Sequence, residues 1–292
     1  MLTLTRLSLA LVLTLSACGS SRSSDPAPPS APSTVLAATT ATGEGCEEAA
    51  ERYRDNDRVW RCEMRTLTLD GNRLSLDASP NGGVKVRPWN GSGIEIRARV
   101  ETWGRTEAEA DRALREVEIR AENASVRTER PDRDRDVWSS VHYEVFVPRE
   151  ADLDLQTVNG AISIAGVTGS TRLRSVNGGI TLDQVGGRIE GETVNGPVRV
   201  ALTEAPSKGV ALSTVNGPLT LSVPGGISAE VDAETSIGPI RIDGLPLEDE
   251  GCEDRDERYG PCMNGRVVGT LGEGGPAFRL RTMNGPIVLE RQ

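Results

Sequence analysis

The chain has 292 residues, a formal net charge of −10, 32 glycines and only 3% aromatic residues. So acidic a chain argues against nucleic acid as a partner and against electrostatic docking on anionic lipid. The scarcity of aromatic residues excludes a globule built around a large aromatic core, and the many glycines favour thin strands joined by many turns.

Residues 1–17 have the pattern of a signal peptide. Arg6 precedes an apolar run from Leu7 to Leu15, which is too short to span a bilayer because a spanning helix needs roughly 20 residues. The letters LSAC end at Cys18 and resemble the bacterial lipobox. That resemblance implies cleavage after Ala17, diacylglycerol on the Cys18 thiol and a further acyl chain, such as palmitate, on the new amino terminus.

We therefore expect a lipid-anchored protein of the cell envelope, attached to the membrane through the lipid on Cys18. Gly19 follows the lipidated cysteine, where some bacteria place an Asp that favours inner-membrane retention, so the outer membrane is the expected location. Residues 18–45 consist mainly of Ser, Pro, Ala and Thr and have almost nothing to bury. They predict a disordered linker.

Four further cysteines can pair in three ways outside the cytoplasm. Proximity in sequence favours two short loops, and no C-x-x-C pair accompanies the single histidine, which argues against zinc. We expect no metal and no cofactor. The cysteines expected to form disulfides are Cys46, Cys62, Cys252 and Cys262, paired as Cys46–Cys62 and Cys252–Cys262.

Residues 46–147 predict a β-rich region with one short helix. Short runs of alternating apolar residues between positions 64 and 104 are typical of strands, and the letters TEAE at 106–109 form a capping box that opens a helix. Because a stack of repeats needs a polar end to stop growth, we expect this region to cap the N-terminal end of the repeat.

Residues 148–292 are dominated by a motif of the form (T/S)-x-N-G-x-φ-x-φ. Four copies place their Asn residues 18, 18 and 21 positions apart, and a degenerate fifth copy, TSIGPIRI, has lost its Asn. A fragment at 81–86 (NGGVKV) is either a stray copy or a coincidence. The copies read TVNGAISI (157–164), SVNGGITL (175–182), TVNGPVRV (193–200), TVNGPLTL (214–221), TSIGPIRI (235–242) and TMNGPIVL (282–289).

Each copy predicts two strands that meet at the Asn-Gly pair. Counting by twos places Thr157 and Asn159 on one buried face, together with Ile162 and Ile164 after the pair. The step from 159 to 162 is odd, so the Asn-Gly pair must hold a corner. Asn and Gly suit a corner because both tolerate positive φ.

Two architectures fit this pattern, an antiparallel meander of hairpins and a stack of identical coils. The regular period and the recurring Asn favour the stack, which is an all-β β-solenoid of about 18–21-residue coils with an N-terminal β and short-helix cap and an insertion at 243–275. Stacking places each Asn over the last, about 4.8 Å apart, in an amide ladder. Its expected members are Asn159, Asn177, Asn195, Asn216 and Asn284.

The repeated units, preceded by the letters VFVP at 145–148, resemble the bacterial putative-adhesin family. The resemblance covers roughly residues 140–292, with a weaker match back to about 62. It implies a domain of β-strand repeats in an exported or envelope protein, and the family name implies adhesion. It brings no catalytic residues.

Three polar features of the sequence are candidate chemical sites. The acidic letters at 132–136 lack the Gly and Glu of a calcium loop and predict a solvated tip. The acidic run at 248–257 predicts a surface loop closed by a disulfide bond. This loop is the first candidate for a site that binds a partner specifically. His142 alternates with apolar residues in a strand, which is typical of a structural role, and we expect no catalytic residue.

The leading hypothesis is a non-enzymatic envelope lipoprotein whose rigid repeat surface mediates adhesion or binds envelope components, either glycan or protein. The alternatives are a polysaccharide-acting β-helix enzyme and an accessory protein of envelope stress or assembly. The repeat carries no row of acids that would serve the enzyme. The outward polar stripe that could meet a partner comprises Ser163, Thr181, Arg199, Thr220 and Arg241.

Overall fold

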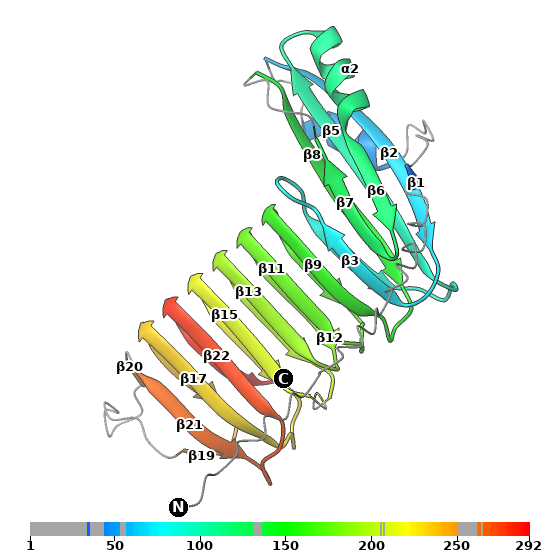
Figure 1. Cartoon of the computed structure of the whole chain (residues 1–292). Helices are drawn as coiled ribbons and strands as arrows, with labels where there is room; N and C mark the ends of the chain where they lie inside the picture. The colour runs from blue at the N-terminus through cyan, green and yellow to red at the C-terminus, as the bar shows by residue number, and fades with distance from the viewer. Residues whose placement is uncertain are drawn as a thin grey trace, which may run out of the picture. The chain divides into compact units, whose positions relative to one another are not determined.

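Each copy of the repeat forms two strands, which meet near the Asn-Gly corner and belong to two different sheets (Figure 1). The computed structural model describes residues 34–35, 44–52, 57–130, 136–204, 206, 208–249, 262–263 and 265–292. This part of the chain is all-β, with two large mixed sheets and two helices.

Sheet A contains the strand that precedes the corner in each copy. Twelve strands are described in it. In spatial order they are β1 (Thr34–Val35), β6 (Glu118–Glu122), β7 (Ser125–Glu129), β3 (Arg73–Asp77), β9 (Asp152–Asn159), β11 (Thr171–Asn177), β13 (Ile189–Asn195), β15 (Val210–Asn216), β22 (Ala277–Asn284), β17 (Ala229–Ile237), β21 (Arg266–Leu271) and β19 (Leu247–Asp249).

Sheet B contains the strand that follows the corner. Eleven strands are described in it. In spatial order they are β2 (Val59–Leu69), β5 (Ile94–Gly104), β8 (Trp138–Val147), β4 (Val84–Pro88), β10 (Ile162–Ala165), β12 (Ile180–Val185), β14 (Val198–Leu202), β16 (Leu219–Val223), β23 (Ile287–Arg291), β18 (Pro239–Asp243) and β20 (Cys262–Met263).

The middle of both sheets is parallel and in register. Ile162 of β10 is paired with Ile180 of β12, and Ile180 is paired with Val198 of β14. Like residues therefore lie over like residues, and the alternating apolar side chains of both sheets fill one continuous core between them. Pairing between successive copies excludes the flat meander of hairpins, because a hairpin would pair the two strands of one copy with each other.

The last copy in the sequence does not lie last in space. Strand β22 lies between β15 and β17, and β23 lies between β16 and β18, all in parallel register. In Figure 1 the red β22 separates two strands that precede it in the chain. The copy at 235–242, which lost its Asn, therefore occupies the position beyond the last copy, and antiparallel β21 and β20 follow it.

The N-terminal region contributes both a unit of the stack and its antiparallel end. Strands β3 and β4 pair in parallel with β9 and β10, so the letters at 81–86 belong to a further unit of the repeat. Strands β2, β5 and β8 then continue sheet B in antiparallel pairing. Helix α2 (Glu107–Glu116) begins with the predicted capping box, which is confirmed. Helix α1 (Glu44–Arg52) was not among the elements predicted from the sequence.

Candidate functional site

The asparagines of the repeat form a continuous row of side-chain hydrogen bonds. Each amide nitrogen donates to the amide oxygen of the previous unit, over 2.8 Å from Asn177 to Asn159 and 2.9 Å from Asn216 to Asn195. The row extends at one end to Asn81, whose oxygen accepts from Asn159 over 2.8 Å. At the other end it stops at Ile237, which is paired with Asn284. The members are Asn81, Asn159, Asn177, Asn195, Asn216 and Asn284.

The expectation that these asparagines point into the core is wrong. Thr157 is buried, but Asn159 and its equivalents in the other copies are exposed. The reason is the corner itself, because Asn is the last residue of the sheet A strand and the chain already turns there. The amide row therefore lies along a surface edge of the stack.

The glycine after each Asn is required by crowding. A Cβ placed on Gly178 would lie 1.9 Å from the backbone oxygen of Gly160 in the neighbouring unit, and one on Gly196 would lie 2.4 Å from that of Gly178. The expectation of a positive φ is confirmed at Gly238 and Gly285, with φ of +144° and +155°, whereas Gly178 and Gly196 have no left-handed φ and are required by crowding alone. Thr193 donates a hydrogen bond from its hydroxyl to the backbone oxygen of Gly178 over 2.8 Å. This bond links its corner to the corner of the neighbouring unit.

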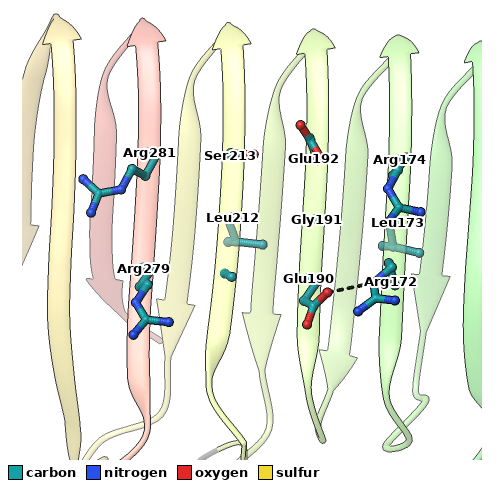
Figure 2. Close-up of a pocket in the computed structure, with 11 residues that line it drawn as sticks. Arg172, Leu173, Arg174, Glu190, Gly191, Glu192, Leu212, Ser213, Arg279 and Arg281 are labelled. Atoms are coloured by element: carbon teal, nitrogen blue, oxygen red, sulfur yellow. Dashed lines mark hydrogen bonds and ion pairs between the residues drawn. The ribbon is translucent and has the colours of Figure 1, made fainter.

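The outer face of sheet A carries a depression of about 320 Å³ over strand β15, which we call the β15 groove (Figure 2). Its floor has the short side chains of Ala211 and Ser213, and strands β13 and β22 flank them with long charged residues. Two rows in strict register cross it, because pairing aligns the outward residues of successive units. The residues that project outward around it are Arg172, Arg174, Glu190, Glu192, Ala211, Ser213, Arg279 and Arg281.

One wall of the β15 groove is acidic and the opposite wall is basic. Glu190, on strand β13, accepts a hydrogen bond of 2.8 Å from Arg172 on the neighbouring strand β11. This hydrogen bond holds the pKa of the Glu190 carboxyl below its ordinary value and raises the pKa of the Arg172 guanidinium. Both groups are therefore charged at neutral pH.

Arg281 of the basic wall pairs with acidic residues of strand β17, which lies on the side of β22 away from the groove. Arg281 contacts Asp232 over 2.7 Å and also pairs with Glu234. A hydrogen bond from Arg266 is the main reason that the pKa of Asp232 is lowered. By contrast, the side chains of Glu192 and Arg279, on opposite walls, form no ion pair or hydrogen bond with a described residue, although the charge of Arg279 helps to lower the pKa of Asp232. The groove thus presents one carboxylate and one guanidinium without a direct side-chain partner among the described residues.

Sequence reasoning missed these groove residues. Their signal is the outward position in each copy, which becomes a row once the copies are stacked. The basic wall, however, belongs to strand β22 of the last copy. If the copies were stacked in sequence order, β17 would lie next to β15, and β22 would lie one unit farther away.

The predicted outward stripe of sheet B is in register over most of its length. Ser163, Thr181, Arg199 and Thr220 are paired in succession. Val288 of the inserted copy then separates Thr220 from Arg241. The stripe is therefore interrupted by an apolar residue just where the order of the units changes.

His142 lies beside a serine and a buried carboxylate, and the arrangement does not suit nucleophilic catalysis. Its Nε2 is 3.0 Å from Ser140 Oγ and 3.4 Å from Glu101 Oε2. The backbone N–H of Gly83 donates to Nδ1, so the neutral imidazole carries its proton on Nε2. Nε2 then has no lone pair to take a proton from Ser140, and the acid does not lie on the opposite ring nitrogen as a triad requires.

The other predicted site residues fall partly outside the described residues. Cys46 and Cys62 form a disulfide bond, as expected. Cys262 lies in β20, whereas Cys252 and Cys18 are not in the described part of the chain, and neither are the acidic letters 132–135 and 250–257. Among the described residues, no three His, Cys, Asp or Glu side chains gather as a metal site, and no helix has the length and apolarity to cross a membrane.

No protein-family model matches the chain, and no curated protein matches it in sequence. Solved bacterial structures do resemble it at 9% identity over 80% of this chain. One is a "putative cell adhesion protein" from Clostridium sporogenes, covered over its full length with a TM-score of 0.44. Two others, each covered over 97%, are described as putative adhesins, from Bacteroides fragilis (TM-score 0.38) and Parabacteroides distasonis (TM-score 0.30).

Proposed function

We propose that this chain is a non-enzymatic envelope lipoprotein that presents a rigid binding surface. In this proposal the in-register units form a β-solenoid, the antiparallel N-terminal strands and helix α2 cap it, and Cys18 anchors it to the outer membrane through lipid. The adhesion or binding role rests on the side chains that the stack holds in fixed rows.

The β15 groove is the observation that carries the proposal. Outward side chains in register repeat at about 4.8 Å across a parallel sheet, so a ligand meets a fixed spacing of charges. The groove is two strand spacings wide between its walls, and its floor consists of the shortest outward side chains on β13, β15 and β22. Fixed groups bind with little loss of conformational entropy, which favours binding of a ligand that matches their spacing.

The experiment fills the groove without touching the core. Ala211→Arg places a long side chain on the exposed floor, and Thr68→Arg puts the same side chain at an exposed position of sheet B outside the polar stripe. We expect the full chain to bind isolated envelope fractions, and Ala211→Arg to lower the bound fraction at least tenfold. Thr68→Arg should leave it unchanged. Equal binding by both variants would remove the groove from the proposal.

A further inference from the structure

On the corner side of the β15 groove, the outward side chains are apolar. Val215 follows Ala211 and Ser213 on the outward side of β15, and Val194 and Met283 hold the equivalent positions on β13 and β22. The side chain of Val194 is 37% exposed and that of Met283 is 54% exposed. We call Val194, Val215 and Met283 the apolar rim. Strand pairing thus gives the groove one apolar end, where a ligand can bury hydrophobic surface.

Two charged levels follow the apolar rim at the spacing of a β-strand. Glu192 and Arg281 flank β15 at the first level, and Glu190 and Arg279 flank it two residues farther from the corner. Figure 2 shows the two glutamates on one side of the groove and the two arginines on the other. Successive outward residues of a strand are about 6.7 Å apart. The walls therefore repeat with the period of an extended chain that lies along β15.

The groove has the width of one extended chain. Strands β13 and β22 each lie one strand spacing from β15, so their backbones are about 9.6 Å apart, and an extended backbone takes about 4.8 Å of that width. The short side chains of Ala211 and Ser213 let such a chain approach the floor, and the Ser213 hydroxyl can hydrogen-bond to its main chain. Because β15 is already paired on both sides, the guest chain lies on the face of sheet A and does not extend the sheet.

The two walls define the charges that a guest chain has to carry. Glu190 and Arg281 are engaged by neighbouring strands, whereas Glu192 and Arg279 have no direct side-chain partner among the described residues. The guest therefore needs a cation on the β13 side and an anion on the β22 side. Adjacent side chains of an extended chain point to opposite sides, so one basic residue next to one acidic residue meets both requirements.

We propose that the β15 groove binds an extended peptide segment that carries adjacent basic and acidic residues and an apolar residue two positions from the basic one. The basic residue pairs with Glu192, the acidic residue with Arg279, and the apolar residue packs on the apolar rim. A polymer with charges of one sign fits less well, because one wall repels it. The proposal rests on the proposed binding function and gives the same groove a ligand class.

Titration calorimetry of the purified full chain with blocked pentapeptides tests the proposal. The matching probes are acetyl-Leu-Ala-Lys-Glu-Ala-amide and the reverse order, acetyl-Ala-Glu-Lys-Ala-Leu-amide, because the guest chain can run in either direction along β15. The mismatched probes carry Lys-Lys or Glu-Glu in place of Lys-Glu. We expect at least one matching probe to bind in the millimolar range, and the mismatched probes to bind about fivefold more weakly or worse, the effect of losing one exposed ion pair.

Glu192→Lys separates an ion pair with the peptide from mere shape. It should weaken the matching probe about tenfold, because attraction becomes repulsion, and it should strengthen binding of the Glu-Glu probe. Glu230→Lys, at an exposed glutamate of β17 outside the groove, changes the net charge equally and is the matched control. It should bind every probe as the unchanged chain does. Since Glu192 and Glu230 are both exposed, both variants should keep the unfolding midpoint, which separates lost binding from lost folding.

Absence of binding by both matching probes at millimolar concentration would overturn the proposal. So would equal affinity for matching and mismatched probes, or an unchanged affinity in Glu192→Lys. If Ala211→Arg lowers envelope binding while no probe binds, the groove takes a ligand of another class, and the peptide inference alone fails. If a matching probe binds and Ala211→Arg leaves envelope binding unchanged, the peptide inference holds and the proposed envelope-binding function fails.

Discussion

Asn284 donates its side-chain amide to Asn216 over 2.9 Å, although 68 residues separate them in the chain. The copy between them in sequence lies on the other side of Asn284, where Ile237 takes the place of an asparagine. The last copy is therefore held by backbone pairing on both sides, and it joins the units at 210–223 to those at 229–243. This order makes the last copy the connection on which the C-terminal end of the stack depends.

Phe278→Ala should show this dependence. Phe278 lies in β22 and is fully buried, and its truncation leaves a cavity, so we expect a loss of about 3–5 kcal/mol in the free energy of unfolding. Phe146→Ala, at a half-buried phenylalanine on the outer face, should cost less than half as much. Urea unfolding measures both. Equal losses would contradict the role of the inserted copy.

Gly178→Ala tests the close approach of the corners. The added methyl group would lie 1.9 Å from the oxygen of Gly160, so neighbouring units must move apart, and we expect a loss of about 3 kcal/mol. The control is Gly71→Ala, where φ is +90° but nothing lies within 4 Å of the added group. Only the left-handed backbone is then penalised, by about 1–2 kcal/mol. A larger loss at Gly71 would refute the crowding argument.

The sequence predicts the all-β class and the equivalence of the copies, because period-two alternation and a repeated corner are local signals. It places Thr157 inside for the same reason. The exposed position of Asn159 could not be predicted in this way, because the alternation of buried and exposed residues holds within a strand and fails at the residue where the strand ends.

The order of the units could not be predicted from the copies. Any copy fits against any other, so local pattern does not say that β22 lies between β15 and β17. The charged walls of the β15 groove depend on that order.

Asn177→Asp tests the amide row. The new carboxylate still accepts from Asn195, but it faces the oxygen of Asn159 without a proton to donate. We expect a loss of about 1 kcal/mol at neutral pH, less at acidic pH where the carboxyl group regains its proton. Asn177→Ala is the control, because its loss should not depend on pH. Thermal unfolding of the variants at both pH values decides between a hydrogen-bonded row and asparagines that only fit the corner.

The disulfide between Cys46 and Cys62 should hold helix α1 in place. The two cysteines are 16 residues apart, and closing a loop of this size stabilises a fold by about 3 kcal/mol. A helix of nine residues is too short to persist alone in water. Replacing both cysteines with serine should therefore remove the hydrogen-exchange protection of α1. The amides of β11 and β13, which lie in the stack, should stay protected.

Lipidation at Cys18 remains a prediction of the sequence. Cys18→Ser should abolish metabolic labelling with a palmitate analogue and release the protein from the membrane fraction. Ser16→Ala, at a neighbouring position of the signal peptide, should leave both unchanged. Labelling that survives Cys18→Ser would overturn the anchor, but it would not bear on the binding role proposed for the folded part.

Tyr143 should make stability depend on alkaline pH. The side chain is buried, its hydroxyl is 2.6 Å from Thr128 Oγ1, and burial raises the pKa of the phenol to about 12 from an ordinary value of 10.0. Below the ordinary value both states hold the proton, so Tyr143 contributes in full. As the pH rises from that value to the folded-state pKa, only the unfolded state releases it, and stability falls by about 1.4 kcal/mol per pH unit.

The loss should approach 3 kcal/mol near the folded-state pKa. Tyr143→Phe removes the titrating group and should flatten this part of the pH profile, while a constant offset reports the lost hydrogen bond to Thr128. Urea unfolding of both proteins across the alkaline range measures the two slopes. Parallel slopes would mean that Tyr143 ionises as easily in the folded protein as in the unfolded chain, and the antiparallel end of the core would then be open to water.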